Sequence, residues 1–217
     1  MSENIKKQIK NLLNRMDLYS LYRLRCKTSP LQADGWFRSF RDNAPVDGDG
    51  NPVPWIAYPA IEFIKNRVKP DMSVFEYGCG GSTYWWASRV KEVIACEHDE
   101  EWYKKTKNDL PINVALHYVS LEYGGEYAGK VAEFPEKFDV VFIDGRDRVN
   151  CAINAVKGLK PDGVIIFDDS NRVEYDDGYQ FLFSNGFRKI EFVGMYPLGI
   201  IKTETAIFYR TDNVFNI

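Results

Sequence analysis

The sequence contains no run of about eighteen apolar residues, so we expect no membrane-spanning helix. It has only four cysteines, none in a CxxC pair, which argues against a disulfide scaffold or a zinc site. We therefore predict reduced thiols and, because no apolar leader is present, a cytoplasmic location. The 28 basic residues nearly balance the 31 acidic ones without any block of like charge, so charge does not indicate a nucleic-acid partner.

Hydrophobic residues make up 45% of the 217 residues, enough for one sizeable α/β domain with an extension. We expect the extension in residues 1–57 and the domain in residues 58–217. The extension starts with apolar residues at helical spacing, separated by lysines and asparagines: Ile5, Ile9, Leu12, Leu13 and Met16. They predict an amphipathic helix that packs on the domain, on a second subunit of a homodimer, or on a membrane surface.

Residues 28–60 carry five prolines and five aromatic side chains. A pure linker is not so aromatic, so we predict an ordered but irregular segment. Such a segment, lying ahead of the first core strand, either forms part of an acceptor pocket or covers an edge of the sheet.

From residue 58 onward, predicted helices alternate with short apolar strands. We expect strands at 73–77, 92–97, 114–119, 138–143 and 164–167, and helices at 58–67, 82–90, 100–109, 149–159 and 175–185. A turn is predicted at Lys160–Gly163. The alternation predicts a doubly wound, mostly parallel, seven-stranded sheet. The last two strands, 188–193 and 205–209, have no helix between them, which indicates an antiparallel edge.

A glycine-rich turn follows the first of these strands, in the run VFEYGCGGST from Val74 to Thr83. About twenty residues later, the strand at 92–97 ends in Glu97. A strand, a permissive turn, a helix and a second strand with a terminal acid make the first half of a nucleotide-binding unit. The turn can bring backbone N–H groups close to a ligand, and the acid can accept hydrogen bonds from ribose hydroxyls.

The spacing of this motif separates two cofactor families. A dinucleotide fingerprint needs a third glycine where this chain has Thr83. Acid-x-Gly-x-Gly with an acid after the next strand resembles the class I S-adenosylmethionine-dependent methyltransferases, over about Val74 to Tyr209. The resemblance implies S-adenosylmethionine as cofactor and a small-molecule acceptor, such as a metabolite hydroxyl or a sugar derivative. It assigns to the cofactor the residues Glu76, Gly78, Gly80, Ser82, Glu97, His98, Ser120 and Asp144.

Acidic residues follow the strands at 138–143 and 164–167, where ligands of open α/β sheets bind. FIDG, ending at Gly145, and IFDD, ending at Asp169, resemble motifs of the small-molecule O-methyltransferases, in which such acids hold a divalent ion. The resemblance makes Asp144 and Asp168 the candidate catalytic residues and leaves Mg²⁺ open. Two departures count against the metal: Asp169 replaces an amide, and Arg146 replaces a lysine. We therefore assign no metal ligand.

Other functions stay compatible with the same pattern. An NAD-dependent oxidoreductase would keep Glu97 on a ribose, but the third glycine and a Tyr-x-x-x-Lys signature are missing. An aminopropyl transferase would use a similar fold with a decarboxylated cofactor. A non-catalytic domain that retains the fold is the third alternative, and the identity of the acceptor is not readable from the sequence.

Overall fold

The computed structural model describes residues 3–217, in which seven strands form one sheet in the order β3-β2-β1-β4-β5-β7-β6. The strands are β1 (Ser73–Tyr77), β2 (Glu92–Glu97), β3 (Val114–Tyr118), β4 (Phe138–Ile143), β5 (Leu159–Asp168), β6 (Arg188–Gly194) and β7 (Thr203–Tyr209). Strands β1 to β5 are parallel to one another, and β7 is antiparallel to both of its neighbours, β5 and β6. The predicted fold class is confirmed, with β7, next to the edge, as the strand that reverses direction.

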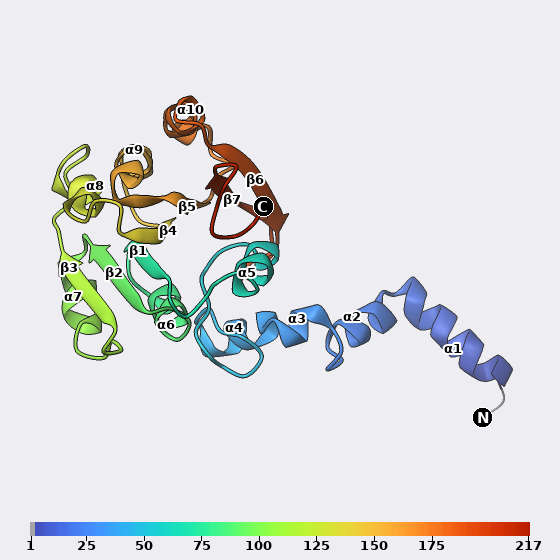
Figure 1. Ribbon diagram of the computed structural model, residues 1–217. Coiled ribbons are helices and arrows are strands. Elements are labelled where there is room, and N and C mark those ends of the chain that lie inside the picture. Colours follow the sequence, from blue (N-terminus) through green and yellow to red (C-terminus); the bar gives the residue numbers. More distant parts are fainter. Residues whose placement is uncertain (1–2) are drawn as a thin grey trace.

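Helices cover both faces of the sheet (Figure 1). They are α1 (Glu3–Arg15), α2 (Leu18–Leu24), α3 (Pro30–Ala33), α4 (Trp36–Asp42), α5 (Tyr58–Lys65), α6 (Gly81–Ala87), α7 (Glu100–Thr106), α8 (Glu126–Gly129), α9 (Arg148–Gly158) and α10 (Asp176–Ser184), with 3-10 turns η1 (Lys130–Glu133) and η2 (Val173–Tyr175). Helices α8, α9 and α10 lie on one face, and α5 and α6 lie on the other. Among residues 3–217, no helix has both the length and the apolar character needed to cross a bilayer.

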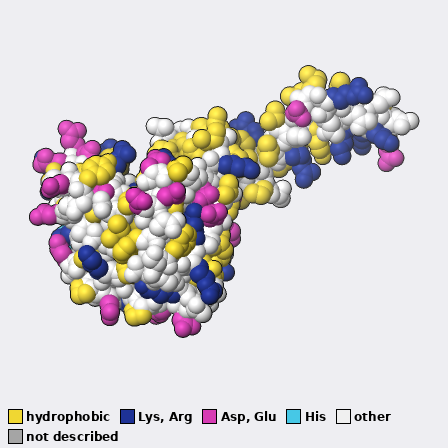
Figure 2. Space-filling view, turned by 90° about the horizontal axis from the view of Figure 1, so that it is seen from above, with side chains coloured by type: hydrophobic (Ala, Val, Ile, Leu, Met, Phe, Trp, Pro, Cys, Tyr) yellow, Lys and Arg dark blue, Asp and Glu magenta, His cyan; other side chains and the backbone are white. Residues whose placement is uncertain are grey.

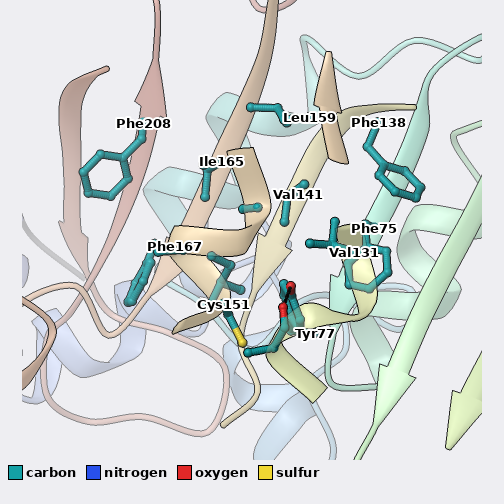
Figure 3. Close-up of a cluster of buried hydrophobic side chains, with 14 of the residues drawn as sticks. Phe75, Tyr77, Val131, Phe138, Val141, Cys151, Leu159, Ile165, Phe167 and Phe208 are labelled. Carbon is teal, nitrogen blue, oxygen red and sulfur yellow. Dashed lines mark hydrogen bonds between the residues drawn. The ribbon is translucent and has the colours of Figure 1, made fainter. Parts of the chain in front are cut away.

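The core consists of two layers, because successive side chains of a strand point to opposite faces of the sheet. Phe75 and Tyr77 of β1 pack with Phe167 of β5 in the layer beneath α9 and α10, shown in Figure 3. Val74 of β1 and Phe142 of β4 belong to the other layer, beneath α5 and α6. Burial on both faces leaves the ends of the strands as the place where polar side chains can meet a ligand.

The predicted turn at Lys160–Gly163 is wrong, because these residues belong to β5. The pairing of β4 with β5 shifts register between Phe138 and Val140, which is where Pro161 falls. A proline is tolerated at such an irregularity because the ladder does not need its missing N–H there. Lys160 is fixed by an ion pair with Asp139 at 2.9 Å between Nζ and Oδ1.

The extension has two parts. Residues 30–57 contain α3 and α4, which the prediction of an irregular segment did not include, and they pack on the domain. Trp36 Nε1 donates a hydrogen bond to the Gly199 carbonyl at 2.7 Å, and the Ala57 N–H donates to Thr205 Oγ1 at 3.2 Å. The predicted boundary at residue 57 therefore falls inside a packed region, whereas α1 and α2 project from the molecule (Figure 1).

Candidate functional site

A cavity of about 1330 Å³ lies at the carboxyl ends of the central strands. Its lining includes residues 76–82 after β1, Glu97 and His98 after β2, and residues 144–150 after β4. Residues 43–46, 52–53 and 55 of the extension line it as well. Of the two roles predicted for the proline-rich segment, contribution to a pocket is therefore the one that its position supports.

Glu76 is a buried carboxylate at the end of β1. Ser82 Oγ donates a hydrogen bond to its Oε1, and Thr83 Oγ1 donates to its Oε2 at 2.6 Å. Burial raises the pKa of Glu76 to about 7, and the two hydroxyls only partly offset this effect. A cationic ligand placed beside Glu76 would therefore stabilise the ionised carboxylate.

The turn after β1 depends on glycine and on Thr83. Gly78 has a φ of +98°, a conformation that strains any residue with a Cβ atom, and its N–H donates to the Cys96 carbonyl at 2.8 Å. Thr83 Oγ1 also accepts a hydrogen bond from the Gly80 N–H at 3.0 Å. Thr83, which stands where a dinucleotide fingerprint has its third glycine, thus connects the turn to Glu76 and to α6.

Glu97 is held by the backbone of the loop that follows β2. Its Oε1 accepts hydrogen bonds from the N–H groups of His98 at 2.7 Å and Asp99 at 2.8 Å. His98 Nδ1 lies 2.9 Å from the same oxygen. Within residues 3–217, Oε2 has no hydrogen-bond donor, so this oxygen is available to a ligand in the cavity.

Asp144 and Arg148 form an ion pair on the opposite side of the turn. Arg148 Nη2 lies 3.1 Å from Asp144 Oδ1, and Nη1 donates a hydrogen bond to the Asp168 carbonyl. Arg148 Nη1 also lies 3.6 Å from Asp169 Oδ2. Burial, reinforced by the neighbouring Asp168, raises the pKa of Asp144 well above its usual range, and Arg148 opposes this shift.

The acids that could hold a divalent ion are arranged differently from a metal site. The Arg148 guanidinium lies between Asp144 and Asp169, where it already supplies positive charge. Asp168 Oδ1 accepts a hydrogen bond from Thr205 Oγ1 at 2.7 Å, and Asp168 does not line the cavity. Among residues 3–217, no three His, Cys, Asp or Glu side chains are grouped as metal ligands. The residues present do not fit Mg²⁺.

Seven of the eight residues predicted to bind the cofactor line this one cavity. The exception, Ser120, is exposed and lies outside the lining. Burial and the neighbouring Asp169 raise the pKa of Asp168 to about 6, but its side chain is turned toward Thr205. A catalytic Asp168 and an adenine contact at Ser120 stay predictions that rest on the sequence.

Three residues of the site received no role from the sequence. Arg148 stands four positions after Asp144, a spacing that favours ion pairs and was an available signal. Trp102 lines the cavity, and its Nε1 donates to the Cys79 carbonyl at 2.7 Å. Tyr127, buried in α8, lies so close to Gly145 that a Cβ atom added to Gly145 would be 2.0 Å from the Tyr127 hydroxyl. No local sequence pattern predicts the contacts of Trp102 and Tyr127.

We predict that Mg²⁺ leaves the melting temperature of the wild-type protein unchanged, because Arg148 occupies the space between the acids. The Arg148→Ser variant should leave Asp144 without its ion pair and Asp169 with Arg172 as its remaining cationic partner. The acids should then gain a Mg²⁺-dependent rise in melting temperature. Thermal unfolding with and without saturating Mg²⁺ measures both effects. Arg146→Ser, which removes an exposed arginine two positions away, is the matched control. A Mg²⁺-dependent rise in the wild type would contradict the assignment.

Comparison with known proteins finds a match to one family model and similarity in fold to solved structures. A family model described as a methyltransferase domain matches residues 75–170. A search of curated proteins finds no match. Similar solved structures include spermidine synthase from Thermotoga maritima, with 18% identity and a TM-score of 0.51 over 68% of this chain. This chain spans only about half of that enzyme, 56% of its length.

Two further structures are similar over more of their own length. Precorrin 8w decarboxylase from Methanobacterium thermoautotrophicum is 20% identical, with a TM-score of 0.52 over 78% of this chain and 97% of that one. Precorrin-6y C5,15-methyltransferase from Geobacter metallireducens GS-15 is 18% identical, with a TM-score of 0.53 over 70% and 87%. These identities support the fold alone. The methyltransferase-domain match over residues 75–170, the motif within it and the order of the strands support the resemblance to the class I S-adenosylmethionine-dependent methyltransferases.

Proposed function

We propose that this protein transfers a methyl group from S-adenosylmethionine to a hydroxyl of a small-molecule acceptor, such as a metabolite or a sugar derivative. The supporting observation is a single cavity that Glu76 and Glu97 line together with Asp144 and the extension. A site for one small ligand measures roughly 300–1,000 Å³. A cavity of about 1330 Å³ leaves room for an acceptor beside the cofactor.

The cofactor side of the cavity would be formed by the first two strands. Glu97 would accept hydrogen bonds from ribose hydroxyls at Oε2, since Oε1 already accepts two backbone N–H groups. Glu76 would face the positively charged methionine end, with the backbone at Gly78 and Gly80 beside it.

The acceptor side would be formed by Asp144 and the extension. S-adenosylmethionine, when bound, supplies a methyl group already activated on a sulfonium. Asp144 would take the hydroxyl proton of the acceptor at Oδ2, because Arg148 holds Oδ1. Burial raises the pKa of Asp144, which makes its carboxylate a stronger base, and Arg148 fixes its orientation. Val53 and Trp55 would help to align the acceptor and exclude water.

The first prediction concerns cofactor choice. Titration calorimetry should show saturable binding of S-adenosylmethionine, weakened about 10- to 100-fold by Glu97→Ala, because an ionic hydrogen-bond acceptor is lost. Glu101→Ala removes an exposed acid from the next helix and should leave binding unchanged. Binding of NAD in place of S-adenosylmethionine would reject the proposal in favour of an oxidoreductase, and preference for the decarboxylated cofactor would favour an aminopropyl transferase.

The second prediction concerns pH. If the ionised form of Glu76 binds the cationic cofactor, affinity should rise about tenfold from about pH 6 to about pH 8. The reason is that the pKa of Glu76 in the free protein is about 7. Glu76→Gln should bind more weakly at high pH and should flatten the profile. An unchanged pH profile in this variant would show that another group carries the titration.

The melting temperature of Glu76→Gln shows whether its weaker cofactor binding has a cause other than misfolding. A carboxyl whose pKa is raised by folding stabilises the folded protein at low pH and loses that contribution as pH rises through about 7. Glu76→Gln removes this loss, so its melting temperature at about pH 8 should exceed that of the wild type. The corresponding gain in the free energy of unfolding should be about 3 kcal/mol.

The third prediction concerns the acceptor. Release of S-adenosylhomocysteine should be detected with members of a panel of hydroxylated metabolites and sugar derivatives, and not with nucleic acid. Once an acceptor is identified, Asp144→Asn should lower kcat by about 100-fold or more, because a general base is removed. Asp99→Asn, at the N-terminus of α7, is a control for loss of an acid near the cavity. Turnover of nucleic acid alone would overturn the small-molecule assignment.

A further inference from the structure

Helices α1 and α2, with the residues that follow them as far as Lys27, form an arm that projects from the domain (Figure 1). We call residues 3–27 the N-terminal arm. Every residue of α1 and α2 is exposed or only half-buried. A 13-residue helix is marginally stable in water without a surface to pack on. The arm therefore needs a partner that the rest of its own chain does not provide.

The arm presents a continuous apolar side. Ile5, Ile9, Leu12 and Met16 recur three or four residues apart along α1 and its end, which places them on one face. They are 44–60% exposed, and Leu21 and Tyr22 of α2 are 56% and 66% exposed. Figure 2 shows apolar side chains gathered along the arm, with lysine and arginine beside them.

The arm and the rest of the chain carry opposite charge. The first 27 residues contain seven Lys and Arg against two Asp and Glu, whereas the remaining residues contain 21 against 29. Lys7 and Lys10 lie on the side of α1 away from its apolar face, and Lys6 and Arg15 lie at its flanks. Such a helix, apolar on one face and basic on the other, is suited to the interface of a bilayer.

We propose that the N-terminal arm lies on the surface of a bilayer that contains anionic lipids. Such a surface accepts the apolar face into the acyl boundary and the basic side chains among the headgroups. Two arms packed against each other would satisfy the apolar faces but would bring two sets of positive charge together. Nucleic acid would neutralise the charge but would leave Leu12 and Met16 in water.

A second apolar feature lies in a loop that contacts α4 of the extension. Ile200 and Ile201 are 78% and 66% exposed in the loop between β6 and β7. Trp36 of α4 holds this loop through its hydrogen bond to Gly199. The loop is at the same edge of the sheet as the cavity, because Thr205 near the start of β7 pairs with Asp168 at the end of β5. A bilayer bound by the arm and this loop would face that edge. The inference does not rest on methyl transfer.

The experiment is vesicle flotation of the full chain, with phosphatidylcholine alone and with added phosphatidylserine. Binding should be about tenfold stronger or more with phosphatidylserine and should weaken as salt rises, because each basic residue near an anionic surface contributes to attraction. Leu12→Asp should abolish binding to both vesicles, and Lys7→Glu should remove the preference for phosphatidylserine. Ile112→Asp, a fully exposed isoleucine on the domain, and Lys91→Glu are matched controls that should bind as the wild type does.

Three results would overturn the proposal. Absence of flotation, or equal and salt-insensitive flotation with both vesicles, would exclude an anionic surface as the partner. Sedimentation that shows a wild-type dimer, made monomeric by Leu12→Asp, would assign the apolar face to a second copy of the chain. Binding of a duplex RNA that survives Leu12→Asp would assign the basic side chains to nucleic acid. Cofactor titration of each variant verifies folding independently of the vesicles.

Discussion

The cost of burying a carboxylate at the end of an apolar strand governs how this molecule is built around its cavity. Each acid there receives a partner from the element that follows it or lies beside it. Glu76 accepts hydroxyls from α6, and Glu97 accepts backbone N–H groups that lead into α7. Asp144 pairs with the first residue of α9, and Asp168 accepts a hydroxyl from β7. These partners connect the strand ends to the surrounding elements, so the same bonds hold the fold and shape the site.

The partners do not remove the cost of burial completely. Burial raises the pKa values of Glu76 and Asp168 to about 7 and about 6, and raises that of Asp144 in spite of Arg148. These acids therefore ionise less readily in the free protein, and a cationic ligand would stabilise their charged forms. Preorganised charge of this kind is expected where a ligand is bound, and it is gained at the expense of stability. Arg148 supplies a fixed positive charge between Asp144 and Asp169.

The extension contributes to two different surfaces. Its second part, residues 30–57, is fixed to the domain by Trp36 and Ala57 and lines the cavity. Its first part, the N-terminal arm, has no buried side chain in α1 or α2 and has a charge opposite to that of the domain. The extension thus lines the cavity with its second part and presents an amphipathic surface outside the domain with its first part.

The sequence by itself determined the features that depend on short spacings. Alternating apolar strands and helices predicted the sheet, and the Glu76-x-Gly78-x-Gly80 turn with Glu97 predicted residues that the structure places in the lining of one cavity. Both patterns are set by neighbours along the chain. The tertiary structure decided what depends on distant residues. Four features join segments that are far apart in the sequence. Strand β7 inserts between β5 and β6, and Lys160–Gly163 extend β5. Asp168 turns toward Thr205, and Tyr127 packs against Gly145. Arg148 depends on both kinds of information. Its spacing from Asp144 is local, whereas its contacts with Asp168 and Asp169 exist only because β4 and β5 end side by side.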